Sequence, residues 1–256
     1  MKTCTILDLG LIGYAPALEL QARLVEARKA ATIGDVLLLC EHRHVITQGR
    51  NGKREHLLAS EDVLRQKGVE FFSTNRGGDI TYHGPGQLVG YPILDLNELR
   101  RDVRWYVDLL EETMLRATAE FGIVAERVTC KRGIWVRPAD GPEEKLAAIG
   151  VHLSRWVTSH GFAYNVSTDL RYFDLMIPCG ISGRKATSLE KILGRACEVS
   201  AVKTAVVKHF AEVFGFDMQE TSRAEFLNRL PAAGRPAAAT EAARGELQLA
   251  AAPSVT

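Results

Sequence analysis

Residues 76–92, RGGDITYHGPGQLVGYP, are the stretch of the sequence that says most about the fold. The first twelve of these residues include four glycines and a proline, which predicts a glycine-rich loop. Glycine adopts positive φ at little cost and lets a ligand approach the main chain, so a binding loop is favoured over an ordinary long hairpin loop. The chain from Leu88 to Leu96 is mostly apolar and predicts a strand, which Pro92 places at a sheet edge.

The segments before this loop predict one helix and two strands. Residues 18–31 mix apolar and charged side chains at helical spacing, and residues 35–40 form a short apolar run that suits a buried strand. Residues 69–74, VEFFST, predict a second strand that leads directly into the loop. The glycine-rich loop is therefore expected between two sheet elements.

The segments after the loop predict two amphipathic helices separated by three strands. The first helix covers residues 103–121, with Asp102 as its cap and Gly122 at its end. The other elements are strands at 133–137, 146–153 and 157–166, a turn at 138–142, and a helix whose apolar face runs from Val199 to Val213. This succession predicts an α+β fold in which neighbouring strands pair antiparallel.

The composition changes at Pro231. Residues 231–256 are rich in Ala, Pro, Gly and Thr and nearly lack large apolar side chains. Such a segment cannot bury enough surface to offset the entropy lost when it becomes ordered. We therefore predict one domain over residues 1–230 and a flexible Ala/Pro-rich tail over residues 231–256.

The composition as a whole is that of an ordinary globular protein without charge bias. The 256 residues are 46% hydrophobic, and 32 Lys and Arg balance 31 Asp and Glu, which argues against a protein that coats nucleic acid. The N-terminal residues lack the apolar run of a signal peptide, and no stretch reaches the ~18 uninterrupted apolar residues of a membrane helix. The sequence thus predicts a cytoplasmic protein.

One of the five cysteines has an unusual setting. The cysteines are scattered without a CxxC pair, which predicts free thiols instead of disulfides or a zinc ribbon. Cys40 lies in an apolar run, and it is expected to be buried and inert, as are Cys4 and Cys197. Cys179 lies between Pro178 and Gly180, which indicates a loop or tight turn and makes it the candidate nucleophile.

The histidines and the loop allow several weaker hypotheses. His83, His152 and His160 are candidate general bases, although satisfied polar residues at sheet ends explain their positions equally well. His42 and His44 lie two residues apart without a nearby Cys/His/Asp cluster, which makes a poor metal site. GxxxxGK[ST] is absent and the loop lacks GxGxxG spacing, so nucleotide chemistry has no support.

Lys145 opens the segment KLAAIGVH at residues 145–152. The small residues Ala147, Ala148 and Gly150 leave room beside it for a chain-like ligand. A solvated lysine at the start of a strand explains the same pattern equally well.

Four segments of the sequence resemble one known family when they are taken in order. They are residues 76–92, KLAAIG at 145–150, HGFAYNV at 160–166 and PCG at 178–180. With them the chain is similar to the bacterial lipoyl(octanoyl) transferases over residues 5–215. The resemblance implies a single catalytic domain like that of biotin and lipoate protein ligases, in which helices flank a mixed, largely antiparallel central sheet.

The resemblance also implies an activity and its partners. Such an acyltransferase takes an octanoyl group from octanoyl-acyl-carrier protein and places it on a lysine of lipoyl domains, the first step of protein lipoylation. The implied acceptors are E2 subunits of 2-oxoacid dehydrogenases and the glycine cleavage H protein. A monomer without metal, nucleotide or redox cofactor is expected.

By the same resemblance, Cys179 carries the acyl thioester and Lys145 is its charge partner. The residues implied to line the acyl site are Arg76, Gly77, Gly78, Asp79, Ile80, Thr81, Tyr82, His83, Ala148, Ile149, Gly150, Gly161, Phe162 and Ala163. A free thiol with a pKa near 8.5 is only a few per cent thiolate at neutral pH, so a cationic neighbour is needed. Main-chain N–H groups, with Gly77, Gly78 or His83, are expected to stabilise the oxyanion, and either Lys145 or a histidine is the base.

The sequence departs from the family pattern at Arg43 and His44, where prolines are more frequent, and in the tail. Three alternatives are an ATP-dependent lipoate or biotin ligase, a thiol hydrolase that pairs Cys179 with His152 or His160, and a non-catalytic protein that binds carrier or lipoyl domains. Activity that survives Cys179→Ala would indicate the ligase. Release of the acyl group to water would indicate the hydrolase, and complex formation without turnover would indicate the binding protein.

Overall fold

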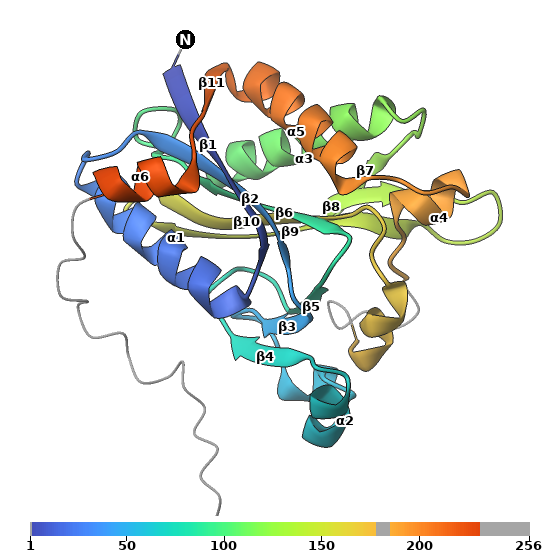
Figure 1. Ribbon diagram of the computed structural model, residues 1–256. Coiled ribbons are helices and arrows are strands. Elements are labelled where there is room, and N and C mark those ends of the chain that lie inside the picture. Colours follow the sequence, from blue (N-terminus) through green and yellow to red (C-terminus); the bar gives the residue numbers. More distant parts are fainter. Residues whose placement is uncertain (1, 178–184, 231–256) are drawn as a thin grey trace, which may run out of the picture.

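The computed structural model describes residues 2–177 and 185–230, and its centre is an eight-stranded sheet (Figure 1). The strand order is β11-β1-β2-β6-β10-β9-β8-β7. The strands are β1 (Lys2–Ile12), β2 (Asp35–His42), β6 (Gln87–Ile93), β7 (Glu126–Val128), β8 (Lys131–Val136), β9 (Glu144–Ser154), β10 (Val157–Asn165) and β11 (Phe216–Glu220). β1 pairs in parallel with β2 and β11, and the other pairs are antiparallel, which confirms the predicted mixed, largely antiparallel sheet.

Helices cover both faces of this sheet (Figure 1). One face packs against α3 (Val103–Ala119), α4 (Leu189–Leu193) and α5 (Val199–Phe214), and the other against α1 (Tyr14–Lys29) and α6 (Arg223–Arg229). β2 shows the division clearly, because Leu37 and Leu39 belong to the first core and Leu38 and Cys40 to the second. Alternate side chains of a strand point to opposite faces, so a strand buried on both sides is apolar throughout.

The helices and the later strands follow the sequence-based predictions closely. The Asp102 carboxylate accepts a hydrogen bond from the Trp105 N–H and caps α3, and Gly122, beyond its end, has φ +75°. β8, β9 and β10 form the predicted antiparallel succession, and α5 carries the predicted apolar face. Cys4, Cys40 and Cys197 are buried as expected, whereas Cys130 is exposed.

The prediction that the strand containing Pro92 lies at a sheet edge was wrong. β6 lies between β2 and β10. The pairing of β6 with β10 ends at Gly90, so the missing N–H of Pro92 removes no hydrogen bond from that ladder. Gly161 in β10 makes room for the proline ring, because a Cβ at this position would lie 2.7 Å from Pro92 Cδ.

The glycine-rich segment contains a strand that the sequence analysis missed. β5 (Ile80–His83) joins β3 (Val45–Gln48) and β4 (Glu70–Ser73) in a second, three-stranded sheet, which lies beside α2 (Glu61–Gln66) (Figure 1). Two short 3-10 helices, at Arg54–His56 and Leu170–Leu175, complete this region. The small sheet has its own apolar core and holds the loop over the large sheet.

Several predictions fall outside the described residues. Cys179 lies in the segment 178–184, and the predicted tail covers residues 231–256. None of the helices within residues 2–177 and 185–230 is long and apolar enough to cross a membrane.

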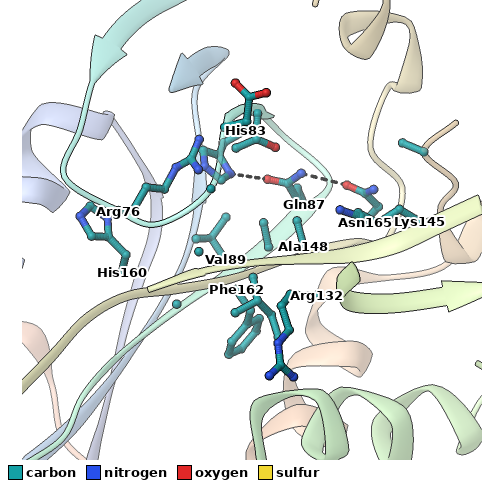
Figure 2. Close-up of a pocket in the computed structure, with 18 of the residues that line it drawn as sticks. Arg76, His83, Gln87, Val89, Arg132, Lys145, Ala148, His160, Phe162 and Asn165 are labelled. Atoms are coloured by element: carbon teal, nitrogen blue, oxygen red, sulfur yellow. Dashed lines mark hydrogen bonds between the residues drawn. The ribbon is translucent and has the colours of Figure 1, made fainter. Parts of the chain in front are cut away.

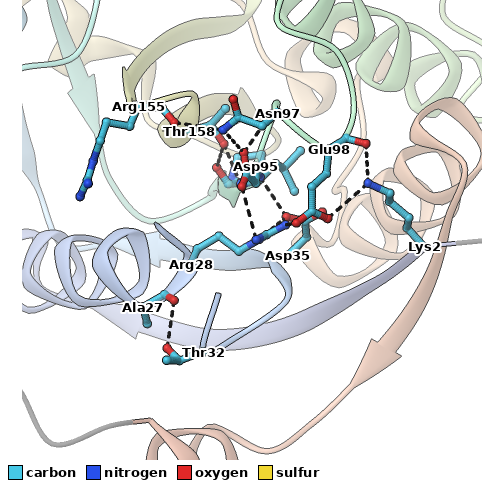
Figure 3. Close-up of polar contacts among 12 residues, drawn as sticks. Lys2, Ala27, Arg28, Thr32, Asp35, Asp95, Asn97, Glu98, Arg155 and Thr158 are labelled. Atoms are coloured by element: carbon cyan, nitrogen blue, oxygen red, sulfur yellow. Dashed lines mark hydrogen bonds and ion pairs between the residues drawn. The ribbon is translucent and has the colours of Figure 1, made fainter. Parts of the chain in front are cut away.

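A buried ion network joins α1 to the sheet (Figure 3). The Arg28 guanidinium, whose side chain is 5% exposed, lies 2.8 Å from Asp35, 3.5 Å from Asp95 and 3.0 Å from Glu98. Asp35 also accepts a hydrogen bond from the main-chain N–H of Asp95. Removing the cation would leave the Asp35 carboxylate buried without its charge partner.

We therefore expect Arg28→Met to lower the free energy of unfolding by about 3–5 kcal/mol, measured by urea unfolding. Arg65→Met is the control, because Arg65 pairs with Asp62 at an exposed site and should change stability by less than about 1 kcal/mol. Equal effects of the two substitutions would contradict a structural role for the buried network.

Candidate functional site

A cavity of about 350 Å³ lies between the glycine-rich loop and the large sheet (Figure 2). It collects side chains from β5, β6, β9 and β10, which are distant in the sequence. Among the residues implied by the family resemblance, those that line it are Arg76, Gly78, Asp79, Ile80, Thr81, His83, Lys145, Ala148, Ile149, Gly150, Gly161, Phe162 and Ala163. Gly77 and Tyr82 do not line it.

Glycines allow the loop to lie directly on β9. The Gly77 N–H donates to the Val151 carbonyl at 2.9 Å, which explains why Gly77 faces the sheet and not the cavity. A Cβ at Gly150 would lie 2.9 Å from the Gly77 carbonyl oxygen, so only glycine fits here without a shift of the loop. The loop position thus depends on a residue of the second motif.

Arg76 holds the start of the loop. Its guanidinium donates to the Thr47 carbonyl at 2.6 Å, to the Thr47 hydroxyl and to the Gly77 carbonyl. The side chain is buried, and these bonds keep its charge beside the cavity. Arg76 therefore orders the loop as well as lining the site.

The floor of the cavity is apolar. Val89 from β6 and Ala148 from β9 lie together below the loop, and Ala163 of β10 pairs with both, whereas the Phe162 ring lies on the other face of the sheet (Figure 2). The Phe162 ring occupies the space over Gly90, where a Cβ would lie 2.2 Å from the ring. A surface of this kind suits a hydrocarbon chain, because burying the chain removes apolar area from water on both partners.

Lys145 supplies a cation at one end of the cavity. Its ammonium lies 4.6 Å from the centroid of the Trp135 ring, a cation–π contact. Its main chain pairs with the segment that follows residue 184 in an isolated parallel bridge, because the Lys145 N–H donates to Lys185 O and the Thr187 N–H donates to Lys145 O, both at 2.9 Å. The lysine and the chain after the Pro-Cys-Gly segment are thus held together.

The chain before that segment is also anchored to the site. The Ile177 N–H donates to the His56 carbonyl at 2.8 Å, and the His56 Nδ1 lies 2.6 Å from the Asp79 carboxylate. Asp79 in turn accepts a hydrogen bond from the Ile80 N–H. His56 lies outside the quoted motifs, so no signal in the sequence indicated that it connects Ile177 to Asp79.

Other predicted candidates lie elsewhere. Tyr82 is buried in the core of the small sheet, where its hydroxyl contacts His44 Nδ1 at 2.7 Å and its ring stacks on Tyr172. His152 contacts Arg50 and does not line the cavity. His42 is buried against Tyr91, and the described part of the chain contains no group of three His, Cys, Asp or Glu placed to hold a metal ion.

The structure adds lining residues that the sequence analysis did not assign to the site. They are Tyr14, Gln87, Val89, Tyr91, Cys130, Lys131, Arg132, Trp135, Asn165, Phe173, Lys185 and Ala186, and His160, named above as a candidate base, lines the cavity as well. Gln87, His160 and Asn165 lie within the quoted motifs, so their positions were available as a signal. The residues of the β7–β8 turn had no local signal, because only the folding of the sheet brings them to the cavity.

Three buried histidines should make stability depend on pH. Burial lowers the pKa of His42 to about 4 and those of His83 and His160 to about 3, so each stays neutral in the folded protein. In the unfolded chain they take up protons near pH 6.5. The unfolded state therefore binds more protons as the pH falls below about 6.5, and stability is lost from there toward about pH 4.

We expect the free energy of unfolding to fall by up to about 1.4 kcal/mol per pH unit for each of these histidines in that window. Urea unfolding at about pH 7 and about pH 5 measures the change. The same free energy of unfolding at both pH values would contradict the assignment of three buried neutral imidazoles.

The family model and the curated relatives that match this chain agree with each other. The family described as "Lipoyl protein ligase A/B catalytic domain" matches residues 13–211. Among curated relatives, an octanoyltransferase from Solibacter usitatus is 53% identical over 218 residues, which are 85% of this chain and 96% of the relative. An octanoyltransferase from Acidobacterium capsulatum is 52% identical over 220 residues, 82% of this chain and 89% of the relative.

Solved structures with low sequence identity share the fold. A bi-partite lipoate protein ligase from Thermoplasma acidophilum superimposes with a TM-score of 0.69 at 14% identity and covers 90% of this chain and 91% of its own. Lipoate-protein ligase A bound with ATP superimposes with a TM-score of 0.65 at 15% identity, over 90% and 92% of the two chains. The predicted similarity to lipoate ligase catalytic domains is thereby confirmed.

Proposed function

The chain belongs to the lipoyl protein ligase A/B catalytic domain family and is an octanoyltransferase, and we propose that it transfers the octanoyl group through a thioester on Cys179. One observation carries this proposal. Phe173 before the Pro-Cys-Gly segment and Lys185 after it line the same cavity as Lys145. The sequence between them contains the cysteine, and the cavity between them has an apolar floor.

In the first half-reaction, the Cys179 thiolate attacks the carbonyl carbon of the octanoyl thioester. The bond from carbon to the Cys179 sulfur forms, and the bond to the carrier sulfur breaks. The Lys145 ammonium favours the thiolate beforehand, by up to ~4 kcal/mol for charges ~4 Å apart at an effective dielectric near 20 and before desolvation. It then gives a proton to the departing carrier thiolate.

In the second half-reaction, the neutral amine of the acceptor lysine attacks the octanoyl-Cys179 thioester. The carbon–nitrogen bond forms as the carbon–sulfur bond breaks, and the amine proton passes to the now neutral Lys145. The Cys179 thiolate and Lys145 ammonium are thereby regenerated, so atoms and charges balance over the cycle. The Gly77 N–H is bonded to the Val151 carbonyl, so we propose that the main-chain N–H of Gly78, which lines the cavity, stabilises the oxyanion.

The partners follow from the activity. An acyl-carrier protein is the donor and lipoyl domains are the acceptors for octanoyltransferases in general. For this chain we propose octanoyl-acyl-carrier protein as donor, and E2 subunits of 2-oxoacid dehydrogenases and the glycine cleavage H protein as acceptors. We further propose a cytoplasmic monomer with a catalytic domain over residues 1–230 and a flexible tail.

The proposal is tested by intact-protein mass spectrometry after incubation with octanoyl-carrier protein and no acceptor, ATP or magnesium. The wild-type protein should gain one octanoyl group, and Cys179→Ser should gain none. Cys130→Ser is the matched control, because Cys130 is the exposed cysteine of the described residues and lies at the cavity. An adduct retained by Cys179→Ser, or a requirement for ATP, would refute the proposal.

A further inference from the structure

A chain of buried side-chain hydrogen bonds runs along one wall of the cavity (Figure 2). His83 Nδ1 lies 2.8 Å from Gln87 Oε1, and Gln87 Nε2 lies 2.8 Å from Asn165 Oδ1. Asn165 Nδ2 donates to the Thr187 carbonyl at 3.0 Å. Gln87 and Asn165 are 2% and 4% exposed, so water does not compete for these bonds.

Two main-chain carbonyls set the direction of every bond in this chain. The Thr187 carbonyl can only accept, so the Asn165 amide must place its NH2 there and its oxygen toward Gln87. Gln87 Nε2 also donates to the Tyr82 carbonyl at 3.2 Å, which fixes the Gln87 amide in the same way. A flip of either amide would bring two oxygens together. Gln87 Oε1 therefore faces His83 as an acceptor.

The direction of these bonds determines the tautomer of His83. An acceptor at Nδ1 requires the imidazole proton on Nδ1. Burial lowers the pKa of His83 to about 3, so the ring is neutral and Nε2 carries a lone pair. The Tyr14 ring lies nearly parallel to the imidazole, with an interplanar angle of 7° and a centroid distance of 6.2 Å.

The lone pair on Nε2 is available to accept a hydrogen bond in the cavity. Within residues 2–177 and 185–230, Nε2 has no hydrogen-bond partner, and His83 lines the cavity. A lone pair repels a carbonyl oxygen or an oxyanion and attracts an N–H or O–H group. His83 in this tautomer is therefore unsuited to the oxyanion-stabilising role that the sequence analysis considered for it.

We propose that Gln87 and Asn165 are positioning residues that hold His83 with its proton on Nδ1, so that Nε2 accepts a hydrogen bond from the amine of the acceptor lysine. This inference rests on the proposed function. Once Cys179 is acylated, the thioester offers only an acceptor oxygen and hydrocarbon, whereas the incoming amine brings N–H donors. One N–H then bonds to Nε2, which helps to orient the amine for attack on the thioester carbon.

The same hydrogen bonds place His83 relative to Lys145. Asn165 donates to the Thr187 carbonyl, and the Thr187 N–H donates to the Lys145 carbonyl. His83 and the main chain of Lys145 are thus connected through Gln87, Asn165 and Thr187. A change at Gln87 breaks the link to His83 and leaves the contact between Thr187 and Lys145 in place.

The tautomer is read directly by long-range proton–nitrogen NMR of protein labelled with nitrogen-15 in histidine. For His83 we expect a protonated Nδ1 and an unprotonated Nε2 in the wild-type protein, and a mixture of tautomers in Gln87→Met. A wild-type His83 protonated on Nε2 would overturn the inference. This measurement needs no substrate, so it decides the tautomer even if Cys179 carries no acyl group.

The role in transfer is tested by separating the half-reactions in rapid-quench experiments. Gln87→Met should form octanoyl-enzyme within about twofold of the wild-type rate and pass the group to a lipoyl domain about tenfold more slowly, the effect of one lost hydrogen bond in a water-excluded site. Thr118→Val is the control, because it removes the buried bond between Thr118 and the Tyr164 hydroxyl beside Asn165, and should slow neither step selectively. Equal slowing of both steps in Gln87→Met would assign Gln87 a merely structural role, whereas absence of any octanoyl-enzyme in the wild type would refute the proposed function instead.

Discussion

Replacing Cys179 by alanine is expected to lower the rate of octanoyl transfer to a lipoyl domain by at least about a thousandfold. Without the sulfur there is no covalent intermediate, and the acceptor amine would have to attack the carrier thioester directly. The measurement is the steady-state rate with octanoyl-carrier protein and a lipoyl domain, followed by mass spectrometry of the acceptor.

The control for this substitution is Cys130→Ala, which changes the exposed thiol beside the cavity and should leave the rate within about threefold. Urea unfolding should show that both variants are folded. A rate for Cys179→Ala within about tenfold of the wild type would contradict covalent catalysis by this residue.

Replacing Lys145 by methionine is expected to lower the rate about a hundredfold near pH 7. Methionine keeps the length of the side chain and much of its contact with Trp135, but it removes the cation that favours the thiolate and the amine that carries the proton. Because an unassisted thiol ionises near pH 8.5, the rate of octanoyl-enzyme formation by Lys145→Met should recover partly as the pH rises to about 9.

Lys191→Met is the matched control, because Lys191 pairs with Glu144 next to Lys145 but does not line the cavity. Its rate should stay within about twofold of the wild type over the same pH range. A pH profile of Lys145→Met parallel to that of the wild type would show that Lys145 does not assist the thiol.

The sequence predicted the elements whose signals are local. Asp102 caps α3 within one turn, and the apolar residues of α3 and α5 recur at helical spacing, so both helices could be placed without a tertiary structure. The edge position predicted from Pro92 was wrong, because a proline removes a hydrogen bond only where its strand is paired, and the pairing of β6 with β10 ends before Pro92. β3 and β5 are four-residue strands whose pairing joins distant segments, and such short runs have little periodicity to detect.

In the site, too, local motifs were predictable and contacts between distant segments were not. The motifs around Arg76, Ala148 and Gly161 supplied most of the residues that line the cavity, but they could not show which side chains face away from it, as that of Tyr82 does. The bond between Gln87 and Asn165 joins residues 78 positions apart, so only the folded sheet reveals it. The placement of Lys145 over Trp135 likewise depends on the pairing of β8 with β9.

The central claim is that an octanoyl-Cys179 thioester lies on the reaction path. Its most direct test is to isolate enzyme carrying an isotope-labelled octanoyl group and to mix it with a lipoyl domain and an excess of unlabelled octanoyl-carrier protein. We predict that the label moves to the acceptor lysine in a single turnover at least as fast as the steady-state rate. A label that stays on the enzyme, or moves more slowly than steady-state turnover, would contradict the account.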